Sequence, residues 1–357
     1  MSVPEGGTHP SLIPPAQRTR LSQSQRLGFT QRRTIMPVAL FLGLAAVYLG
    51  MVWLTLAVPT PIALLLSPLC GVAIGVLFVL AHDAAHNSLT ASSWLNQLIG
   101  RLAFLPSLHS FTTWDIAHNQ IHHRYNSLRG WDTVWEPMSP EDYLASGGAR
   151  RALYRFYRSP LGVPFYYMMV IWAPAHCGAA SYIRQRWGAM FAVDLLLVLA
   201  FLAGQVLAVT AVGAAYGHGA LASLLLGLVV PFLVWNGLMS IAVFLHHTHP
   251  ALRWYPDLDA WKADRGAIAG TAHVRFAGPV KALMLWIMEH NAHHAAPGVP
   301  FYNLAGMQKA MAAHEDMLSW GFTLRGFIRV CKRCKLYDYE QGRWVTFEEG
   351  RTRRPAV

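Results

Sequence analysis

The sequence has 357 residues, of which 54% are apolar and only 13% are charged, with a net charge of +11. Soluble domains carry nearer 25% charged residues, so this composition excludes an ordinary soluble globular protein and indicates a membrane protein. The four cysteines argue against a disulfide framework in a cytosol-facing chain. Cys331 and Cys334 form a single CxxC pair, which we expect to be ordinary reduced thiols.

Two long stretches without charged side chains predict four transmembrane helices. No Asp, Glu, Lys or Arg occurs from Thr34 to Ala81, and only Asp194 occurs between Trp187 and Leu252. Each stretch is long enough for two spans of about 20 residues. The first is broken at the prolines of residues 58–61 and the second at the glycines of residues 213–219. We expect the spans at about 35–57, 62–81, 191–213 and 220–245.

The distribution of basic residues predicts the orientation. All 29 Lys and Arg lie outside the spans and their short turns, on one side, which the positive-inside rule makes cytosolic. Both termini are therefore expected in the cytosol, as in a multi-pass protein of a bacterial inner membrane. The polar segment before the first span does not resemble a signal peptide.

Three regions are expected along the chain. Residues 1–33 are interpreted as a disordered cytosolic tail, residues 34–320 as the membrane domain, and residues 321–357 as a basic cytosolic tail. The apolar segment Leu161 to Ala173 has Arg158 before it and Pro164 inside it, and at this length it is too short to cross a bilayer. It is predicted to be an interfacial helix. Asp194 is expected either to be a functional intramembrane charge or to pair near the membrane surface.

Histidines are the other unusual feature, because there are 17 of them and most fall in short clusters. The clusters are His82 and His86 at the end of the second span, His118, His122 and His123 in the first cytosolic region, His246, His247 and His249 at the end of the fourth span, and His290, His293 and His294 in the second cytosolic region. Such spacings on a helix aim several imidazoles at one point. Eight or nine converging imidazoles exceed the four ligands of one zinc ion, so two metal ions are implied.

The fourth cluster competes for one remaining ligand position. On a continuing helix His246 and His247 point about 100° apart, so both cannot face one metal. Pro250 bends the chain just beyond and can turn His249 inward. We expect Asp83, Asp132 and Glu289, with His249, to be the groups that support the ligands, because metal-bound imidazoles usually donate their other N–H to a carboxylate or carbonyl. His109 and His273 lie close to the motifs as well.

The histidine motifs HDAAH, HNQIHH and HNAHH, in this order and with four spans in two pairs, resemble the membrane fatty acid desaturases from about residue 36 to 320. Finer features are similar to the acyl-lipid omega-6 (Δ12) branch. They are HTHP at 247–250, WDTVWEP at 131–137, and MEHNAHH at 288–294 before PFYNL at 300–304. The chain departs from the family at Ala84-Ala85, where a Cys-Gly pair is frequent. It also has three residues before the histidine pair of HNQIHH, where plant relatives have two.

The resemblance implies an all-α integral membrane enzyme with a cytosolic histidine-rich helical cap and a di-iron centre. A nitrogen-rich site suits redox-active iron without excluding other metals. The family pattern makes iron the expected metal and O2 the co-substrate, and it favours His247 over His249 and His246. The expected ligands are His82, His86, His118, His122, His123, His247, His290, His293 and His294.

The resemblance also implies the partners: a membrane lipid or acyl thioester as substrate and a ferredoxin-like or haem-protein electron donor. The chain has no dinucleotide-binding fingerprint, and no nucleic-acid partner is expected. Two alternatives stay open at this point. A related membrane di-iron hydroxylase, acetylenase or non-lipid oxidase would use the same motifs, and a metal transporter would need ligands near the bilayer midplane.

Overall fold

The computed structural model describes residues 21–177, 181–264 and 266–352. Within these residues, four helices are long and apolar enough to cross a membrane: Ile35–Ala57 (α2), Thr60–Ala85 (α3), Gly188–Ala215 and Ala220–His247. The predicted all-α membrane fold with four spans is confirmed. The second span begins earlier than expected because Pro61 lies in the first helical turn, where a missing N–H costs no hydrogen bond.

The third span lies in α11 (Ser181–Ala215), and the fourth is built from α12 (Ala220–Leu224), the π-helical η6 (Leu225–Val229) and α13 (Val230–His247). The elements outside the spans are α1 (Gln23–Leu27), η2 (Gly28–Thr30), α4 (Ser93–Phe104), η3 (Leu105–Ser107), α5 (Phe111–Trp114), η4 (Asp115–His122), α6 (His123–Tyr125), α7 (Pro140–Ala145), α8 (Gly148–Tyr157), α9 (Val163–Tyr166), η5 (Tyr167–Trp172), α10 (Ala173–Cys177), α14 (Leu258–Ala263), α15 (Gly266–Ala269), β1 (His273–Arg275), α16 (Gly278–Leu283), α17 (His290–Ala295), α18 (Phe301–His314), β2 (Ser319–Gly321), α19 (Leu324–Arg333), β3 (Leu336–Asp338), β4 (Arg343–Val345) and α20 (Phe347–Thr352). Strand β1 pairs in parallel with β2, and β3 pairs in antiparallel with β4.

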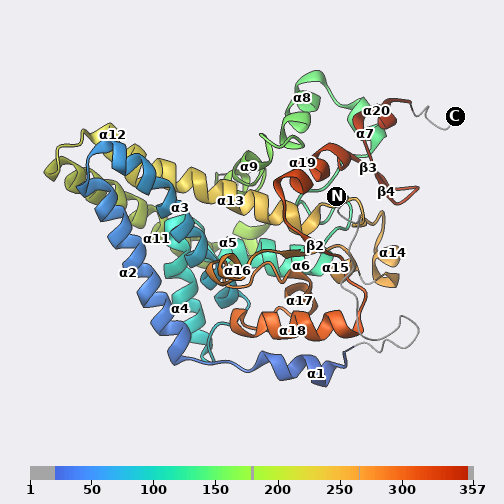
Figure 1. Cartoon of the computed structure of the whole chain (residues 1–357), viewed down its shortest axis with the longest axis horizontal. Helices are drawn as coiled ribbons and strands as arrows, with labels where there is room; N and C mark the ends of the chain where they lie inside the picture. Colours follow the sequence, from blue (N-terminus) through green and yellow to red (C-terminus); the bar gives the residue numbers. More distant parts are fainter. Residues whose placement is uncertain (1–20, 178–180, 265, 353–357) are drawn as a thin grey trace.

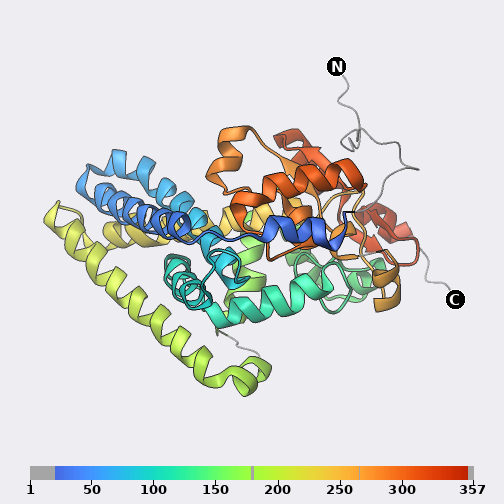
Figure 2. The ribbon, with the colours of Figure 1, turned by 90° about the horizontal axis from the view of Figure 1, so that it is seen from below.

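The two helical hairpins turn at the same end of the molecule. His218 Nε2 lies 3.0 Å from the Val58 carbonyl oxygen, and the rings of Trp53 and Tyr216 meet edge to face. Figure 1 shows this end at the left, with the short elements of the later chain gathered at the right. Figure 2 shows α11 diverging from the other spans away from the hairpin turns. The opposite ends of α3 and α13, which carry histidines, therefore point into the part of the molecule outside the membrane.

Helices α3 and α13 form the centre of the bundle and are its most buried spans. They approach closely at Gly71, where an added Cβ would lie only 2.6 Å from the Pro231 carbonyl oxygen. Closer to the histidines, Phe78 of α3 packs against Trp235 of α13 and Trp114 of α5. This aromatic packing fixes the ends of both helices beside the helix that carries the second histidine motif.

Asp194 of α11 is a buried structural partner. Its Oδ1 accepts a hydrogen bond from Arg101 Nε at 2.7 Å, and its Oδ2 accepts hydrogen bonds from the Thr112 N–H and hydroxyl at 2.7 and 2.6 Å. Pairing, one of the two roles expected for this acid, is thus observed. The carboxylate ties the third span to the first turn of α5, which continues into the second histidine motif.

The described parts of the two expected tails contain ordered elements, while residues 1–20 and 353–357 lie outside the described residues. Residues 21–33 include α1, whose Ser22 and Gln25 form a capping box, and Arg26 pairs with Glu315 at 2.6 Å. This correction to the expected disordered tail has a physical reason, since local capping and a tertiary ion pair stabilise the short helix. The predicted tail from residue 321 likewise contains α19, with Phe327 and Val330 buried.

Cys331 and Cys334 are free, buried cysteines, as the single CxxC pair predicted. Burial raises the pKa of the Cys331 thiol to about 12 and that of Cys334 higher still. Both thiols are therefore protonated and packed against apolar neighbours of the α19 region.

The segment expected to be an interfacial helix does not qualify as a span, but it lies deeper than the surface. The Tyr167 N–H donates to Ser240 Oγ at 3.1 Å, and Trp172 packs against Phe232 with ring centroids 5.1 Å apart. Ser240 and Phe232 are eight residues apart on α13, so η5 follows this span for about 12 Å. The segment forms one wall of the cavity that is described below.

Candidate metal centre

The nine histidines expected as ligands come together in two groups. His82, His86, His118, His123 and His293 form the first, and His122, His247, His290 and His294 form the second. Within each group one ring nitrogen from each histidine lies within 4.8 Å of those of the others. The ends of α3 and α13, the α5–η4–α6 helix and α17 supply them, so segments far apart in the sequence converge.

A π-helical turn divides the second motif between the groups. Residues 115–122 form η4, and the His123 N–H bonds to the His118 carbonyl five residues earlier. In an α-helix residues five apart point about 140° apart, but the wider π turn brings them to nearly the same side. His118 and His123 therefore join the first group while His122 joins the second. The ordinary helix expected for this motif from its spacing was therefore wrong.

The imidazole nitrogens face one another closely. His118 Nε2 lies 3.0 Å from His82 Nε2 and 3.1 Å from His123 Nε2, which is itself 2.9 Å from His293 Nε2. In the second group His290 Nε2 lies 3.0 Å from His247 Nε2. A neutral imidazole has one N–H and one lone pair. Single hydrogens cannot satisfy all of these nitrogen pairs at once.

Burial and unsatisfied nitrogens test whether the site fits metal ions. Among the described residues, both nitrogens of His294, Nε2 of His86 and Nδ1 of His290 are buried without a hydrogen-bond partner. Burial, followed by the neighbouring histidines, lowers the pKa of His86, His118, His123, His290, His293 and His294 well below the usual value. Neutral imidazoles with free lone pairs are the form that binds a metal. The residues therefore fit one metal ion in each group.

Two of the expected carboxylates contact histidines of the groups directly. Asp132 Oδ1 accepts from His122 Nδ1 at 3.0 Å, and backbone N–H groups of Ser127 and Val134 hold the carboxylate. Asp83 Oδ1 lies 3.2 Å from His82 Nδ1, and its Oδ2 accepts from the Phe301 N–H at 2.6 Å. Each contact leaves the histidine Nε2 as the nitrogen that faces its group.

The other two expected supporting residues lie elsewhere. The Glu289 carboxylate is 2.6 Å from His273 Nε2 and 2.7 Å from Lys281 Nζ, and these described side-chain partners do not belong to either histidine group. Burial acts to raise the pKa of Glu289, but His273 and Lys281 outweigh it and lower this pKa. His249 packs against Trp320, and its Nδ1 accepts from the Ala251 N–H. His249 is therefore outside both groups.

His246 and His109 are buried histidines outside the groups. The His246 ring stacks on His290 with centroids 3.7 Å apart, and its Nε2 lies 3.1 Å from Met288 Sδ. His109 Nδ1 lies 2.9 Å from the Ser107 carbonyl oxygen, so it donates there, and its Nε2 accepts from the Tyr167 hydroxyl at 2.9 Å. Both line the adjoining cavity.

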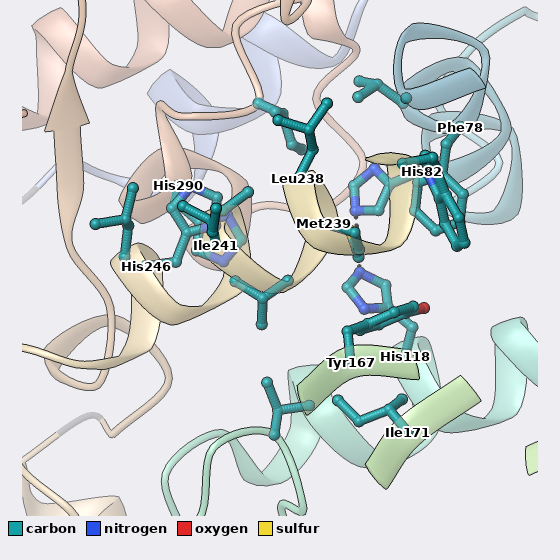
Figure 3. A pocket seen from close by; sticks show the side chains of 18 of the residues that line it. Phe78, His82, His118, Tyr167, Ile171, Leu238, Met239, Ile241, His246 and His290 are labelled. Atoms are coloured by element: carbon teal, nitrogen blue, oxygen red, sulfur yellow. Dashed lines mark hydrogen bonds between the residues drawn. The ribbon is translucent and has the colours of Figure 1, made fainter. Parts of the chain in front are cut away.

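An apolar cavity of about 500 Å³ leads to the histidines. Figure 3 shows His246 and His290 on one side of it and His82 and His118 on the other, with Met239 and Ile241 of α13 between them. Tyr167 and Ile171 lie across the cavity from Leu238. Its volume is in the usual range for small-molecule sites, roughly 300–1,000 Å³. Almost all of its lining is apolar, so it suits an alkyl chain.

Sequence reasoning missed this cavity and the π turn. The cavity walls come from α3, α13, η5 and α16, and each wall reads in sequence as an ordinary apolar row. The extra residue of HNQIHH was the only available signal for the π turn, because one additional residue in a helix is often accommodated by such a turn.

Known proteins resemble the chain over most of its length. A family model for fatty acid desaturases matches residues 59–322. An sn-1 oleoyl-lipid 12-desaturase from a Synechocystis strain is 29% identical over 76% of this chain and 75% of its own length. One of the same name from a Picosynechococcus strain is 29% identical over 80% of this chain and 79% of its own.

A plant relative belongs to the same branch. The chloroplastic omega-6 fatty acid desaturase of Spinacia oleracea is 29% identical over 78% of this chain and 60% of its own length. These relatives agree with the omega-6 resemblance of the sequence motifs. With four spans, paired histidine groups and a family model that covers more than half of its residues, the chain belongs to the membrane fatty acid desaturase family of oxidoreductases.

Proposed function

We propose that this chain is an O2-dependent di-iron desaturase that introduces a cis double bond into an acyl chain of a membrane lipid. The observation that carries the proposal is the apolar cavity whose wall includes histidines of both groups. The relatives named sn-1 oleoyl-lipid 12-desaturases support an oleoyl chain as substrate and carbon 12 as the site of the new bond.

The first group would hold one iron and the second group the other, with the nine histidines as ligands. When bound, the iron pair would supply the oxidising chemistry, in which O2, two electrons and two protons remove one hydrogen from each of two adjacent methylenes and yield the alkene and two waters. Asp83 and Asp132 would keep His82 and His122 oriented by accepting their Nδ1 hydrogens.

The cavity walls would select the reacting carbons. A methylene has no charge and no hydrogen bond, so only its placement along the walls distinguishes it from its neighbours. Phe78, Trp114 and Trp235 would hold the chain by apolar contact and exclude water from the reacting region.

We further propose that the electrons come from an external ferredoxin-like or haem-protein donor on the cytosolic side of a bacterial inner membrane. The net charge of +11 supports an acidic partner, and it suits anionic lipid headgroups as well. In this orientation both termini and the metal centre face the cytosol.

The test is expression in a host whose lipids carry only saturated and monounsaturated chains, with the double bonds mapped in each lipid class. We expect dienes with the second double bond at carbon 12. The matched control is His290→Ala at equal expression, which should give none. Gain of an oxygen atom in place of loss of two hydrogens would show a hydroxylase, and unchanged lipids with iron bound would contradict the proposal.

A further inference from the structure

Three apolar residues both line the cavity and are exposed on the outside of the protein. They are Leu238 on α13, 43% exposed, and Val280 and Leu283 on α16, 39% and 53% exposed. A residue that faces the interior and the exterior at once marks an opening. These three side chains therefore frame a mouth between α13 and α16.

The mouth lies at the level of the bilayer. Leu238 is nine residues before His247, or about 13 Å along the span, and so below the cytosolic end of α13. Lys281 is the one charged residue of α16, and its ammonium group donates to Glu289 at 2.7 Å. The exposed side chains of α16, which include Val280 and Leu283, are therefore apolar. An exposed apolar face at the end of two spans is stable against lipid tails and unfavourable against water.

A continuous apolar wall leads from the mouth to the second histidine group. Met284, Ile287 and Met288 line the cavity after Leu283. Met288 then contacts His246, which stacks on His290. Methionine side chains are flexible and adapt to the shape of a passing chain. A lipid tail entering at Leu283 would thus meet no polar barrier before the metal centre.

A fourth exposed lining residue is polar. Thr133, in the loop after the second histidine motif, is exposed and lines the same cavity. Its polar side chain and its loop position suit the aqueous side. An acyl group delivered on a water-soluble carrier would approach there, whereas an intact lipid would enter from the bilayer.

We propose that the acyl chain enters sideways from the bilayer through the mouth framed by Leu238, Val280 and Leu283, while the headgroup stays at the membrane surface. The substrate is then an intact membrane lipid and not a soluble acyl thioester. This inference rests on the proposed desaturase function, which already takes a membrane lipid as substrate, and adds the route by which its acyl chain enters.

The test uses the purified holoenzyme in vesicles of dioleoyl-phosphatidylglycerol. The protein is reduced with dithionite and mixed with O2, so that the diene yield of a single turnover needs no electron donor. Leu283→Trp should lower the turnover rate by about tenfold or more, because a side chain in the mouth hinders correct placement of the chain. Leu196→Trp is the matched control, since Leu196 is exposed on α11 and does not line the cavity.

A labelling experiment does not depend on the folding of the tryptophan variant. Leu283→Cys is made in a Cys177→Ser background, because the chain has four native cysteines and the other three, Cys70, Cys331 and Cys334, are buried. This variant should turn over normally until a bulky maleimide is attached. Loss of turnover after labelling, with bound metal unchanged, supports the mouth. Full turnover after labelling, together with loss in Thr133→Trp or preference for a soluble oleoyl thioester, would overturn it. Absence of diene from wild-type protein with either substrate would instead contradict the desaturase function.

Discussion

His246 and His247 are neighbours with equally buried rings, but their surroundings differ. His247 Nε2 lies 3.0 Å from His290 Nε2, and its Nδ1 donates to the Gly270 carbonyl at 3.3 Å. This backbone bond holds the ring with Nε2 turned toward the second group. His246 contacts Met288 and stacks on His290 from outside the group. The expected order, with His247 before His246, agrees with this placement.

At this scale we predict that His247→Ala lowers the diene yield by more than about 100-fold and also lowers the bound iron. The reason is that the second group would lose one of its four imidazoles. His246→Ala should keep both within severalfold, since it removes contacts with Met288 and the His290 ring but no imidazole of either group. Diene yield and iron content at matched expression are the measurements. Equal tolerance of the two substitutions would remove His247 from the metal site.

The individual histidines and two of the carboxylates could be predicted from sequence because their spacing is local. His82 and His86 are one helical turn apart, and Asp83 adjoins His82. Glu289 could not be assigned in this way. Its partner His273 lies on β1, and its position depends on pairing with β2 from residues 319–321, more than forty residues away.

At the scale of elements, the π turn η4 explains how one helix serves both groups. The backbone bond from His123 to His118 widens the turn by one residue. Asn119 within this turn donates to the Ala85 carbonyl at 2.9 Å and to Asp115 at 2.6 Å. The turn is thereby tied to the end of α3, next to His86.

We predict that deletion of Gln120 preserves the metal site. The shortened motif would form an α-helix in which the first and last histidines are four residues apart. Their side chains would then point about 40° apart, which is close to the angle that the π turn gives them now. Insertion of an alanine after Gln120 should rotate the histidine pair by about 100° and abolish iron binding. Iron content of both variants at matched expression decides the matter. An equal loss of iron from both variants would contradict this account, because it would show that the metal site needs Gln120 and not only the correct angle between the histidines.

At the scale of the whole molecule, hydrophobic runs with proline and glycine breaks were sufficient to predict the four spans within a few residues. The depth of η5 along α13 and the cavity were not predictable. Both depend on packing between segments whose sequences are uniformly apolar, and no single residue marks which side faces lipid, protein or substrate.

The orientation gives a prediction of its own. With all 29 Lys and Arg outside the spans on one side, tags at both termini should resist external protease in intact cells and be cleaved after lysis. Cleavage of either tag in intact cells would contradict the proposed topology.

The central claim is that each of the two histidine groups binds one metal ion. The iron content of the purified protein tests this claim most directly. Because five and four imidazoles form separate groups, we predict about two irons per chain, more than a single four-coordinate ion could account for. Removal of iron by chelation should abolish desaturation, and its return should restore it. One zinc ion per chain with desaturation fully retained would contradict the account.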